Sequence, residues 1–348
     1  MNFASDNVHG VHPKVLKALS DCNEGAVASY GADPVTARAE AAYREILDAP
    51  EAVVRFVATG TGANALVCAQ LSPSYGRIYC HDSAHLHRDE CAAPEFYSHG
   101  AKLVPLPGGQ GKFSPEVLDG AIRFGAAGSL NDGRNALVSI TNATEWGTCY
   151  SPAEVAALAR LAHQGGMKLH MDGARFANAV AGLGCAPADL GHRAGVDALC
   201  LGGTKNGALA AEAVVFFDPR DAEGFDFRRK QAGQVYSKQR YLAAQMLALA
   251  EDGLWLELAR HANAMAARLG QGAVQAGGEL VAPVQANEVF VRLPAEAHAH
   301  ARAHGAAYHI WQDQPPAEGE PVTVRLVTSW ATREDDVGRF LELLRGAA

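Results

Sequence analysis

The chain has 348 residues, of which 48% are hydrophobic and 20% are charged, and its formal net charge is −8 at pH 7. Because Lys and Arg are outnumbered and scattered, the composition argues against a nucleic-acid partner or an anionic membrane surface. The sequence also predicts a reduced, cytoplasmic protein without a signal peptide or membrane helix, since its seven Cys form no Cys-x-x-Cys pair and no apolar run reaches about 18–20 residues.

The first elements in chain order are a helix, a strand and a second helix. An Asp-Pro pair at 33–34 predicts a helix to about Leu47, because Asp caps a helix and Pro fits its first position. The β-branched run 53–58 then predicts a short strand, which ends in the glycine-rich turn 59–62. A helix is expected from about Ala63.

The middle of the chain alternates apolar runs with helical patterns. Residues 136–140 predict a strand, and the sequence Ser-Pro-Ala-Glu at 151–154 is a capping box that opens a helix ending at 165–166. Further strands are expected at 167–171 and 198–201. Such alternation, with polar residues at strand ends, is typical of an α/β domain whose mostly parallel sheet binds ligands beyond its carboxyl ends.

The pattern changes after about residue 240. A long helical region is expected from Arg240 to about Leu269, followed by strands at 289–293 and 322–327. In these strands polar and apolar residues alternate more than they form continuous apolar runs, which predicts an antiparallel sheet with one face in water. The chain is therefore divided into a large α/β domain with its N-terminal segment, 1–245, and a small C-terminal α+β domain, 246–348.

Three features carry candidate chemistry. Gly60-Thr61-Gly62 opens a helix, where N–H groups and the helix dipole favour an anion, although an ordinary strand–helix turn has the same pattern. Asp172 ends a strand and faces the usual ligand crevice, unless it only caps the next helix. Lys205 follows another strand among glycines, where an amine can form a Schiff base with a carbonyl cofactor; a solvated loop lysine is the alternative. The fourteen His show no metal-ligand spacing, so no metal is expected.

Taken together, these features match the needs of one cofactor. Pyridoxal 5'-phosphate (PLP) requires an anion cradle, a cover for its ring, a carboxylate that keeps the ring nitrogen protonated, and an amine for its aldehyde. The turn at 60–62, His85, Asp172 and Lys205 supply one each. The sequence therefore predicts a PLP enzyme whose cofactor ring accepts electrons from the substrate Cα.

The whole chain resembles the threonine aldolase family, in the β-eliminating lyase branch of the aspartate-aminotransferase-like (type I) fold of PLP enzymes. The matching stretches follow the family's order from end to end: FASD at 3–6, YGADP at 30–34, TGTGAN at 59–64, SAH at 83–85, HMDGAR at 170–175, GTKNG at 203–207 and VRLVT at 324–328. The resemblance implies an α/β fold with a large, mostly parallel sheet domain and a smaller C-terminal α+β domain.

The resemblance also implies roles for the matching residues. Lys205 would bind PLP, Asp172 would pair with its ring nitrogen, His85 would stack on the ring, Gly60 and Thr61 would hold the phosphate, and Ser5, Arg175 and Arg325 would grip the substrate carboxylate, with Arg175 also contacting the cofactor. A guanidinium meets a carboxylate in a bidentate fork and so fixes its orientation. The basic residues Arg229, Lys230 and Lys238 would reach the phosphate of a neighbouring subunit, or would form only a solvated basic helix.

The chain departs from the family pattern at one position. Where better-known members carry a second active-site His in a His-Asn-Gly sequence, residues 142–147 read NATEWG, and Glu145 aligns with that His. Glu145 is thus a candidate base for the substrate β-hydroxyl, or else a solvated loop acid. His85 is the competing base, but a ring stacked on the cofactor suits orientation better than proton transfer.

The resemblance implies an aldehyde-lyase that cleaves threonine, allo-threonine and related β-hydroxy-α-amino acids, phenylserine among them, to glycine and an aldehyde. It further implies L stereochemistry at Cα and a homotetramer, a dimer of dimers, with active sites between subunits. Two alternatives stay open: β-elimination or transamination on the same fold, and a non-catalytic binding protein. The intact set of Lys205, Asp172 and Arg325 argues against the second alternative.

Overall fold

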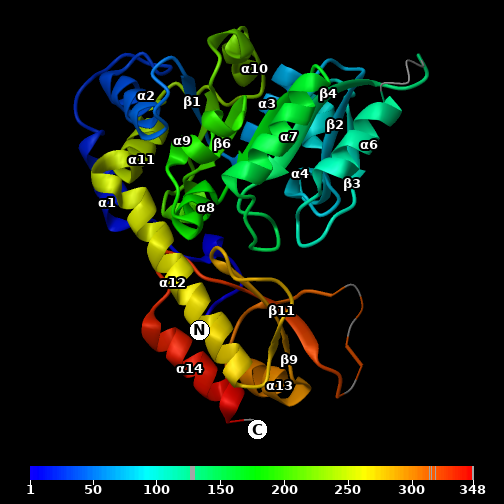
Figure 1. The fold of residues 1–348 in the computed structure, drawn as a ribbon. Helices are drawn as coiled ribbons and strands as arrows, with labels where there is room; N and C mark the ends of the chain where they lie inside the picture. Colours follow the sequence, from blue (N-terminus) through cyan, green and yellow to red (C-terminus); the bar gives the residue numbers. More distant parts are fainter. Residues whose placement is uncertain (126–129, 313, 315, 318, 347–348) are drawn as a thin grey trace.

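The computed structural model describes residues 1–125, 130–312, 314, 316–317 and 319–346, which form two β-sheets with their covering helices (Figure 1). The larger sheet has seven strands, in the spatial order β1 (Val53–Val57), β7 (Glu212–Phe216), β6 (Ala198–Gly202), β5 (Lys168–Gly173), β4 (Arg134–Thr141), β2 (Gly76–His81) and β3 (Lys102–Leu106). The strands from β6 to β3 pair in parallel, whereas β7 runs antiparallel between β1 and β6. The predicted mostly parallel sheet is confirmed.

Both faces of the large sheet are covered, which explains why β6 and β7 are buried at every residue. In β6, Leu199 and Leu201 face one core, while Ala198 and Cys200 face another. Residues of the first core come from α1 (Pro13–Asp21), α2 (Pro34–Ile46), α6 (Pro115–Gly125), α7 (Pro152–Gln164), α8 (Phe176–Leu183), α9 (Pro187–Leu190) and α11 (Arg240–Ala250). The opposite face packs against α3 (Gly60–Leu71), α4 (His85–Arg88), α5 (Ala93–Tyr97) and α10 (Phe225–Gln231).

The helix predicted from Arg240 to about Leu269 is two helices rather than one. α11 ends at Ala250 and α12 (Leu254–Gln275) begins after a break in which Asp252 and Gly253 have positive φ angles, 54° and 69°. A left-handed residue cannot continue a right-handed helix, so the chain changes direction there. α12 leads from the large sheet towards the small one (Figure 1).

The small sheet is antiparallel, as predicted, with the order β10 (His309–Ile310), β11 (Val322–Val327), β9 (Glu288–Leu293) and β8 (Glu279–Leu280). One of its faces packs on α12, α13 (Ala295–Ala303) and α14 (Glu334–Arg345). The expectation that its other face lies in water is wrong for most of β9, where Arg292 alone is exposed. Phe290 on that face packs on Trp146, with ring centroids 5.0 Å apart, and Glu288 is buried there too.

The N-terminal residues lie against the small sheet. Asn2 forms a β-bridge with Ala307, and Phe3 is buried in the same core as β9 and β11. This contact carries the next residues, from Ser5 onwards, to the boundary between the two sheets. The division into domains at 245 and 246 stays a prediction.

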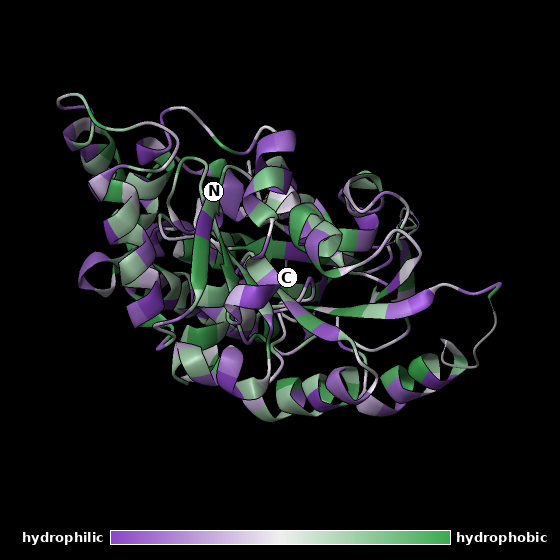
Figure 2. Ribbon diagram, turned by 90° about the horizontal axis from the view of Figure 1, so that it is seen from above, coloured by the Kyte–Doolittle hydropathy of each residue, from purple (hydrophilic) through white to green (hydrophobic). Residues whose placement is uncertain are grey.

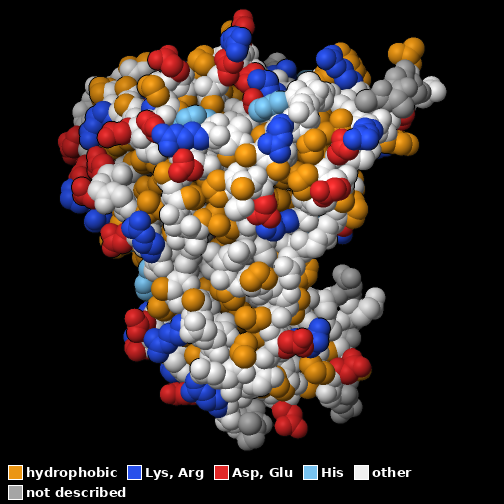
Figure 3. Space-filling model, in the orientation of Figure 1, with side chains coloured by type: hydrophobic (Ala, Val, Ile, Leu, Met, Phe, Trp, Pro, Cys, Tyr) orange, Lys and Arg blue, Asp and Glu red, His pale blue; other side chains and the backbone are white. Residues whose placement is uncertain are grey.

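The surface shows no strong segregation of charge on the face seen in Figure 3, where acidic and basic side chains are interspersed. Hydrophobic residues concentrate in the central strands, and the surrounding helices alternate hydrophilic and hydrophobic positions (Figure 2). Within the described ranges, no helix combines the length and the apolarity that crossing a membrane requires.

Candidate active site

A cavity of about 700 Å³ lies where the carboxyl ends of the central strands face the small sheet. Residues far apart in sequence line it, and they include the predicted cofactor-binding, catalytic and substrate-binding residues of this chain, although not the basic residues assigned to a neighbouring subunit: Ser5, Gly60, Thr61, His85, Glu145, Asp172, Arg175, Lys205 and Arg325. The large sheet supplies most of them from its strand ends. The small sheet supplies Arg325 on β11, and the N-terminal segment supplies Ser5.

The glycine-rich turn forms the start of α3, which begins at Gly60 rather than near Ala63. Thr59 caps the helix, and its Oγ1 accepts a hydrogen bond from the Gly62 N–H at 3.1 Å. A Cβ on Gly62 would lie 2.9 Å from that same oxygen, whereas a Cβ on Gly60 would meet nothing within 4 Å. The first turn of α3 is therefore open to the cavity, where its N–H groups and the helix dipole favour an anion.

Asp172 lies near the end of β5 and is almost fully buried, with 4% of its surface exposed. Its Oδ2 accepts a hydrogen bond from Asn64 Nδ2 at 2.8 Å, and its Oδ1 accepts one from the Ala174 N–H at 2.9 Å. The alternative role of helix cap is excluded, because the N-cap of α8 is Arg175. A buried carboxylate at a strand end of the cavity is available for a ligand.

Lys205 lies in the short 3-10 helix Thr204–Asn206 that follows β6, and its side chain lines the cavity. Its amine has no hydrogen-bond or ion-pair partner within the described residues. Beside it on β7, Glu212 is buried and accepts a hydrogen bond from the Gly203 N–H at 2.9 Å. Burial raises the pKa of Glu212 to about 7, although the charge of Lys205 opposes the shift.

These groups fit PLP. The first turn of α3 offers N–H donors for a phosphate, Asp172 offers a buried carboxylate for a ring nitrogen, and Lys205 offers an amine without a partner. His85 opens α4 at the cavity, with its Nδ1 2.9 Å from Glu90 Oε1. For comparison, the described residues hold no group of three or more His, Cys, Asp or Glu arranged for a metal ion.

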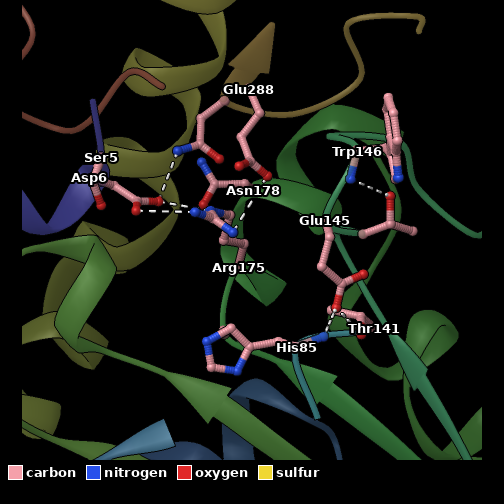
Figure 4. A network of polar contacts seen from close by, with 12 residues as sticks. Ser5, Asp6, His85, Thr141, Glu145, Trp146, Arg175, Asn178 and Glu288 are labelled. Atoms are coloured by element: carbon pink, nitrogen blue, oxygen red, sulfur yellow. Dashed lines mark hydrogen bonds and ion pairs between the residues drawn. The ribbon is translucent and has the colours of Figure 1, made fainter. Parts of the chain in front are cut away.

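Arg175 is already engaged by two buried acids (Figure 4). Its Nε and Nη2 donate to the carboxylate of Asp6 at 2.7 and 3.1 Å, and its Nη1 lies 3.3 Å from Glu288 Oε2. Burial raises the pKa of Asp6, but the charges of Arg175 and Lys205 outweigh it and hold that pKa below its usual value. Burial raises the pKa of Glu288 despite Arg175. A substrate carboxylate would therefore have to share the guanidinium of Arg175 with Asp6 and Glu288.

Arg325 has unused hydrogen-bonding capacity in the cavity. Its guanidinium lies over the ring of Trp311, 4.7 Å from the centroid, and its Nε is buried without a partner in the described part of the chain. Desolvation lowers the pKa of Arg325, yet a guanidinium stays charged in proteins. Of the two arginines, Arg325 is the one that an entering carboxylate can pair with directly.

Glu145 is half-buried and its Oε2 has almost no exposed surface, so the alternative interpretation as a solvated loop acid is wrong. Its Oε1 accepts hydrogen bonds from the His85 N–H at 2.7 Å and from Thr141 Oγ1 at 2.8 Å. Its Oε2 is buried and has no partner in the described structure. Burial raises the pKa of Glu145 to about 7, against the lowering effect of those two donors. One carboxylate oxygen is thus held in place and the other is free to exchange a proton.

Several residues in or beside the cavity had no role in the sequence analysis: Asn64, Glu90, Glu212, Glu288 and Trp311 line it, and Asp6 contacts its Arg175. Two of these, Asp6 and Asn64, belong to the motifs FASD and TGTGAN, so their position in a motif was an available signal. The others stand outside any motif. Glu90, Glu212 and Glu288 are distinguished by the burial of their acidic side chains, which the sequence does not reveal.

The basic stretch is not uniformly solvated. Arg229 is buried, with 5% of its surface exposed, and lies 3.6 Å from Asp226, whereas Lys230 and Lys238 are exposed. The reading as a solvated basic helix is therefore wrong for Arg229. Its role towards a neighbouring subunit stays a prediction.

Three comparisons relate the chain to known proteins. The family model described as beta-eliminating lyase matches residues 2–296. A low-specificity L-threonine aldolase from Pseudomonas aeruginosa is 41% identical over 345 residues, which cover 99% of this chain and 96% of that protein. The structure of a threonine aldolase from Leishmania major is 30% identical, with a TM-score of 0.93 over 100% of this chain and 99% of that one. A structure of SPT with PLP, 15% identical, shares the fold alone, with a TM-score of 0.70 over 100% and 87%.

Proposed function

Because this chain belongs to the beta-eliminating lyase family and, within it, to the threonine aldolases, we propose that it cleaves L-threonine, L-allo-threonine and related β-hydroxy-α-amino acids to glycine and an aldehyde. The observation that carries the proposal is that one cavity brings together the Lys205 amine, the buried Asp172 carboxylate, the N-terminus of α3 and the Arg325 guanidinium, whose Nε has no hydrogen-bond partner in the described part of the chain. Phenylserine is included as a proposed substrate.

The residues that would hold the cofactor each match one of its groups. Lys205 would bind the aldehyde, Asp172 the ring nitrogen, and the first turn of α3 at Gly60 and Thr61 the phosphate. His85 would cover the ring. When bound, PLP supplies an electron sink for the bond that breaks at the substrate Cα.

Substrate orientation falls to Arg325. Its planar guanidinium pairs with a carboxylate through two hydrogen bonds, which fixes the direction of the Cα bonds relative to the cavity. Ser5, whose Oγ accepts the Asn7 N–H at 3.1 Å, and Arg175 would assist at the same carboxylate. Orientation matters because it selects which bond at Cα breaks, and so separates retro-aldol cleavage from β-elimination and transamination.

Glu145 would take the proton of the β-hydroxyl. Its anchored Oε1 fixes the side chain, and its free Oε2 is the atom that would accept. A pKa of about 7 suits this work, since a base works best when its pKa lies near the operating pH. His85 remains the competing candidate.

The reaction is tested by its products. Incubation of the purified protein with PLP and L-threonine should release acetaldehyde and glycine in equal amounts. Release of ammonia and a keto acid instead would favour β-elimination. A protein that gains no cofactor absorbance with PLP and turns nothing over would be a binding protein.

Three further properties belong to the proposal: a cytoplasmic location, a role in glycine formation, and a homotetramer built as a dimer of dimers with sites at subunit interfaces. Sedimentation of the full chain with PLP tests the assembly. A monomer that retains full activity would contradict it.

Arg325→Lys should weaken catalysis although the charge is kept. Lysine lacks the planar fork and is not conservative where a carboxylate is bound bidentately. We expect kcat/KM for L-threonine to fall at least about tenfold, roughly 1.4 kcal/mol of transition-state binding. Steady-state kinetics measure this. Kinetics equal to wild type would remove Arg325 from the substrate site.

Asp172→Asn should separate cofactor binding from turnover. Asparagine keeps the shape and the contact with Asn64 but cannot carry the charge that stabilises a protonated ring nitrogen. We expect kcat to fall by about an order of magnitude or more, while PLP occupancy after dialysis changes much less. Near-normal turnover in this variant would mean that Asp172 only supports the fold.

A further inference from the structure

A buried carboxylate that no sequence pattern singled out joins two side chains of the site. Glu90 follows α4, and its side chain has no exposed surface. Its Oε1 accepts a hydrogen bond from Asn64 Nδ2 at 2.8 Å and lies 2.9 Å from His85 Nδ1. The same Asn64 nitrogen donates to Asp172 Oδ2 at 2.8 Å. A continuous chain of contacts thus runs from His85 through Glu90 and Asn64 to Asp172.

The chemistry of these groups fixes where their hydrogens lie. An ionised carboxylate only accepts, so His85 Nδ1 carries a hydrogen whenever Glu90 is charged. The Asn64 amide has two N–H hydrogens, one for each carboxylate. A reversed amide would set its oxygen against two acceptors, which excludes that orientation. His85 is therefore held with Nε2 on the ring edge away from Glu90.

We propose that Glu90 is a positioning residue, which fixes the tautomer and orientation of His85 and, through Asn64, the orientation of Asp172. The proposal rests on the proposed function for the roles of those two side chains: one covers the cofactor ring and the other meets its nitrogen. A single buried anchor would then align both. Oriented partners of this kind act through the groups they hold rather than on the substrate.

The charges around His85 agree with this arrangement. The hydrogen bond that His85 donates to Glu90 raises the pKa of His85, and burial lowers it. The charge of Asp172 raises this pKa further, while that of Lys205 lowers it. Glu145 meets His85 only at the backbone N–H. Since Glu90 has the largest influence, loss of its charge should move the titration of His85 to lower pH.

The test follows the His85 ring by NMR in the full chain with labelled histidine, with and without PLP; the spectrum of His85→Asn assigns the signal. In the wild type, the neutral ring should carry its hydrogen on Nδ1. Glu90→Gln should shift the titration to lower pH, and kcat should fall about tenfold with little change in KM. Glu95→Gln is the matched control, because Glu95 is a partly buried acid in α5 outside the cavity lining.

Asn64→Ala separates the two branches of the contact chain. It should leave the titration of His85 near that of wild type, yet change the pH dependence of the bound cofactor's absorbance, because Asp172 loses a donor. A neutral His85 with its hydrogen on Nε2, an unchanged titration in Glu90→Gln, or an equal shift in Glu95→Gln would overturn the proposal. If Glu90→Gln does not fold, the wild-type tautomer and Asn64→Ala decide. The tautomer, the titration of His85 and the absorbance of the bound cofactor do not need turnover, so a failure of these readouts is distinct from failure of the proposed function.

Discussion

Lys205→Ala should abolish covalent attachment of PLP and reduce L-threonine cleavage by about 10³-fold or more, the scale of losses when a covalent catalytic group is removed. The expectation follows from the lone position of this amine in the cavity, where it has no partner within the described residues. Borohydride reduction of the wild type with PLP, followed by peptide mapping, should place the pyridoxyl group on Lys205.

Lys102→Ala provides the control, since Lys102 is exposed on β3 and lies outside the cavity lining. This variant should keep both the absorbance of the bound cofactor and the turnover of the wild type. A pyridoxyl group found on any other lysine of the wild type would refute the assignment of Lys205. This result would not affect the family membership of the chain, but another lysine would have to be assigned as the one that binds PLP.

Glu145→Gln should lower the rate of retro-aldol cleavage by about 10²-fold or more, within the range that a general base contributes. Glutamine keeps the size and can still accept from His85 and Thr141, so the variant isolates the loss of the proton acceptor. Exchange of the glycine α-proton needs no β-hydroxyl and should be much less affected. Equal loss in both reactions, or in neither, would show that Glu145 is not the base.

The pH profile gives a second measure of the same role. Burial raises the pKa of Glu145 to about 7, and the ionised form is the one that accepts a proton. Cleavage should therefore rise with pH through about 7 and level off above it, as Glu145 loses its proton. In Glu145→Gln this rise should vanish from kcat/KM, which reports the free enzyme.

The sequence by itself determined the type of several main elements, although it did not predict the strands β2, β3 and β7 of the large sheet. Period and cap residues are local signals, so the helix at 34–46, the capping box before α7 and the strands β4, β5 and β6 followed from neighbouring residues. The motifs around Asp172 and Lys205 also indicated the chemistry of a PLP enzyme. Boundaries were less certain where a turn residue decides them, as at the start of α3 and at the break between α11 and α12.

Only the tertiary structure decided how the charged groups of the cavity share their partners. The sequence assigned Arg175 and Arg325 the same role at the substrate carboxylate. In the structure, Arg175 pairs with Asp6 and Glu288, whereas the Nε of Arg325 has no partner among the described residues. The sequence also allowed Glu145 to be a solvated loop acid. In the structure its carboxylate is desolvated, and burial raises its pKa. Pairing and desolvation depend on residues that are distant in the chain, and a local sequence pattern carries no record of them.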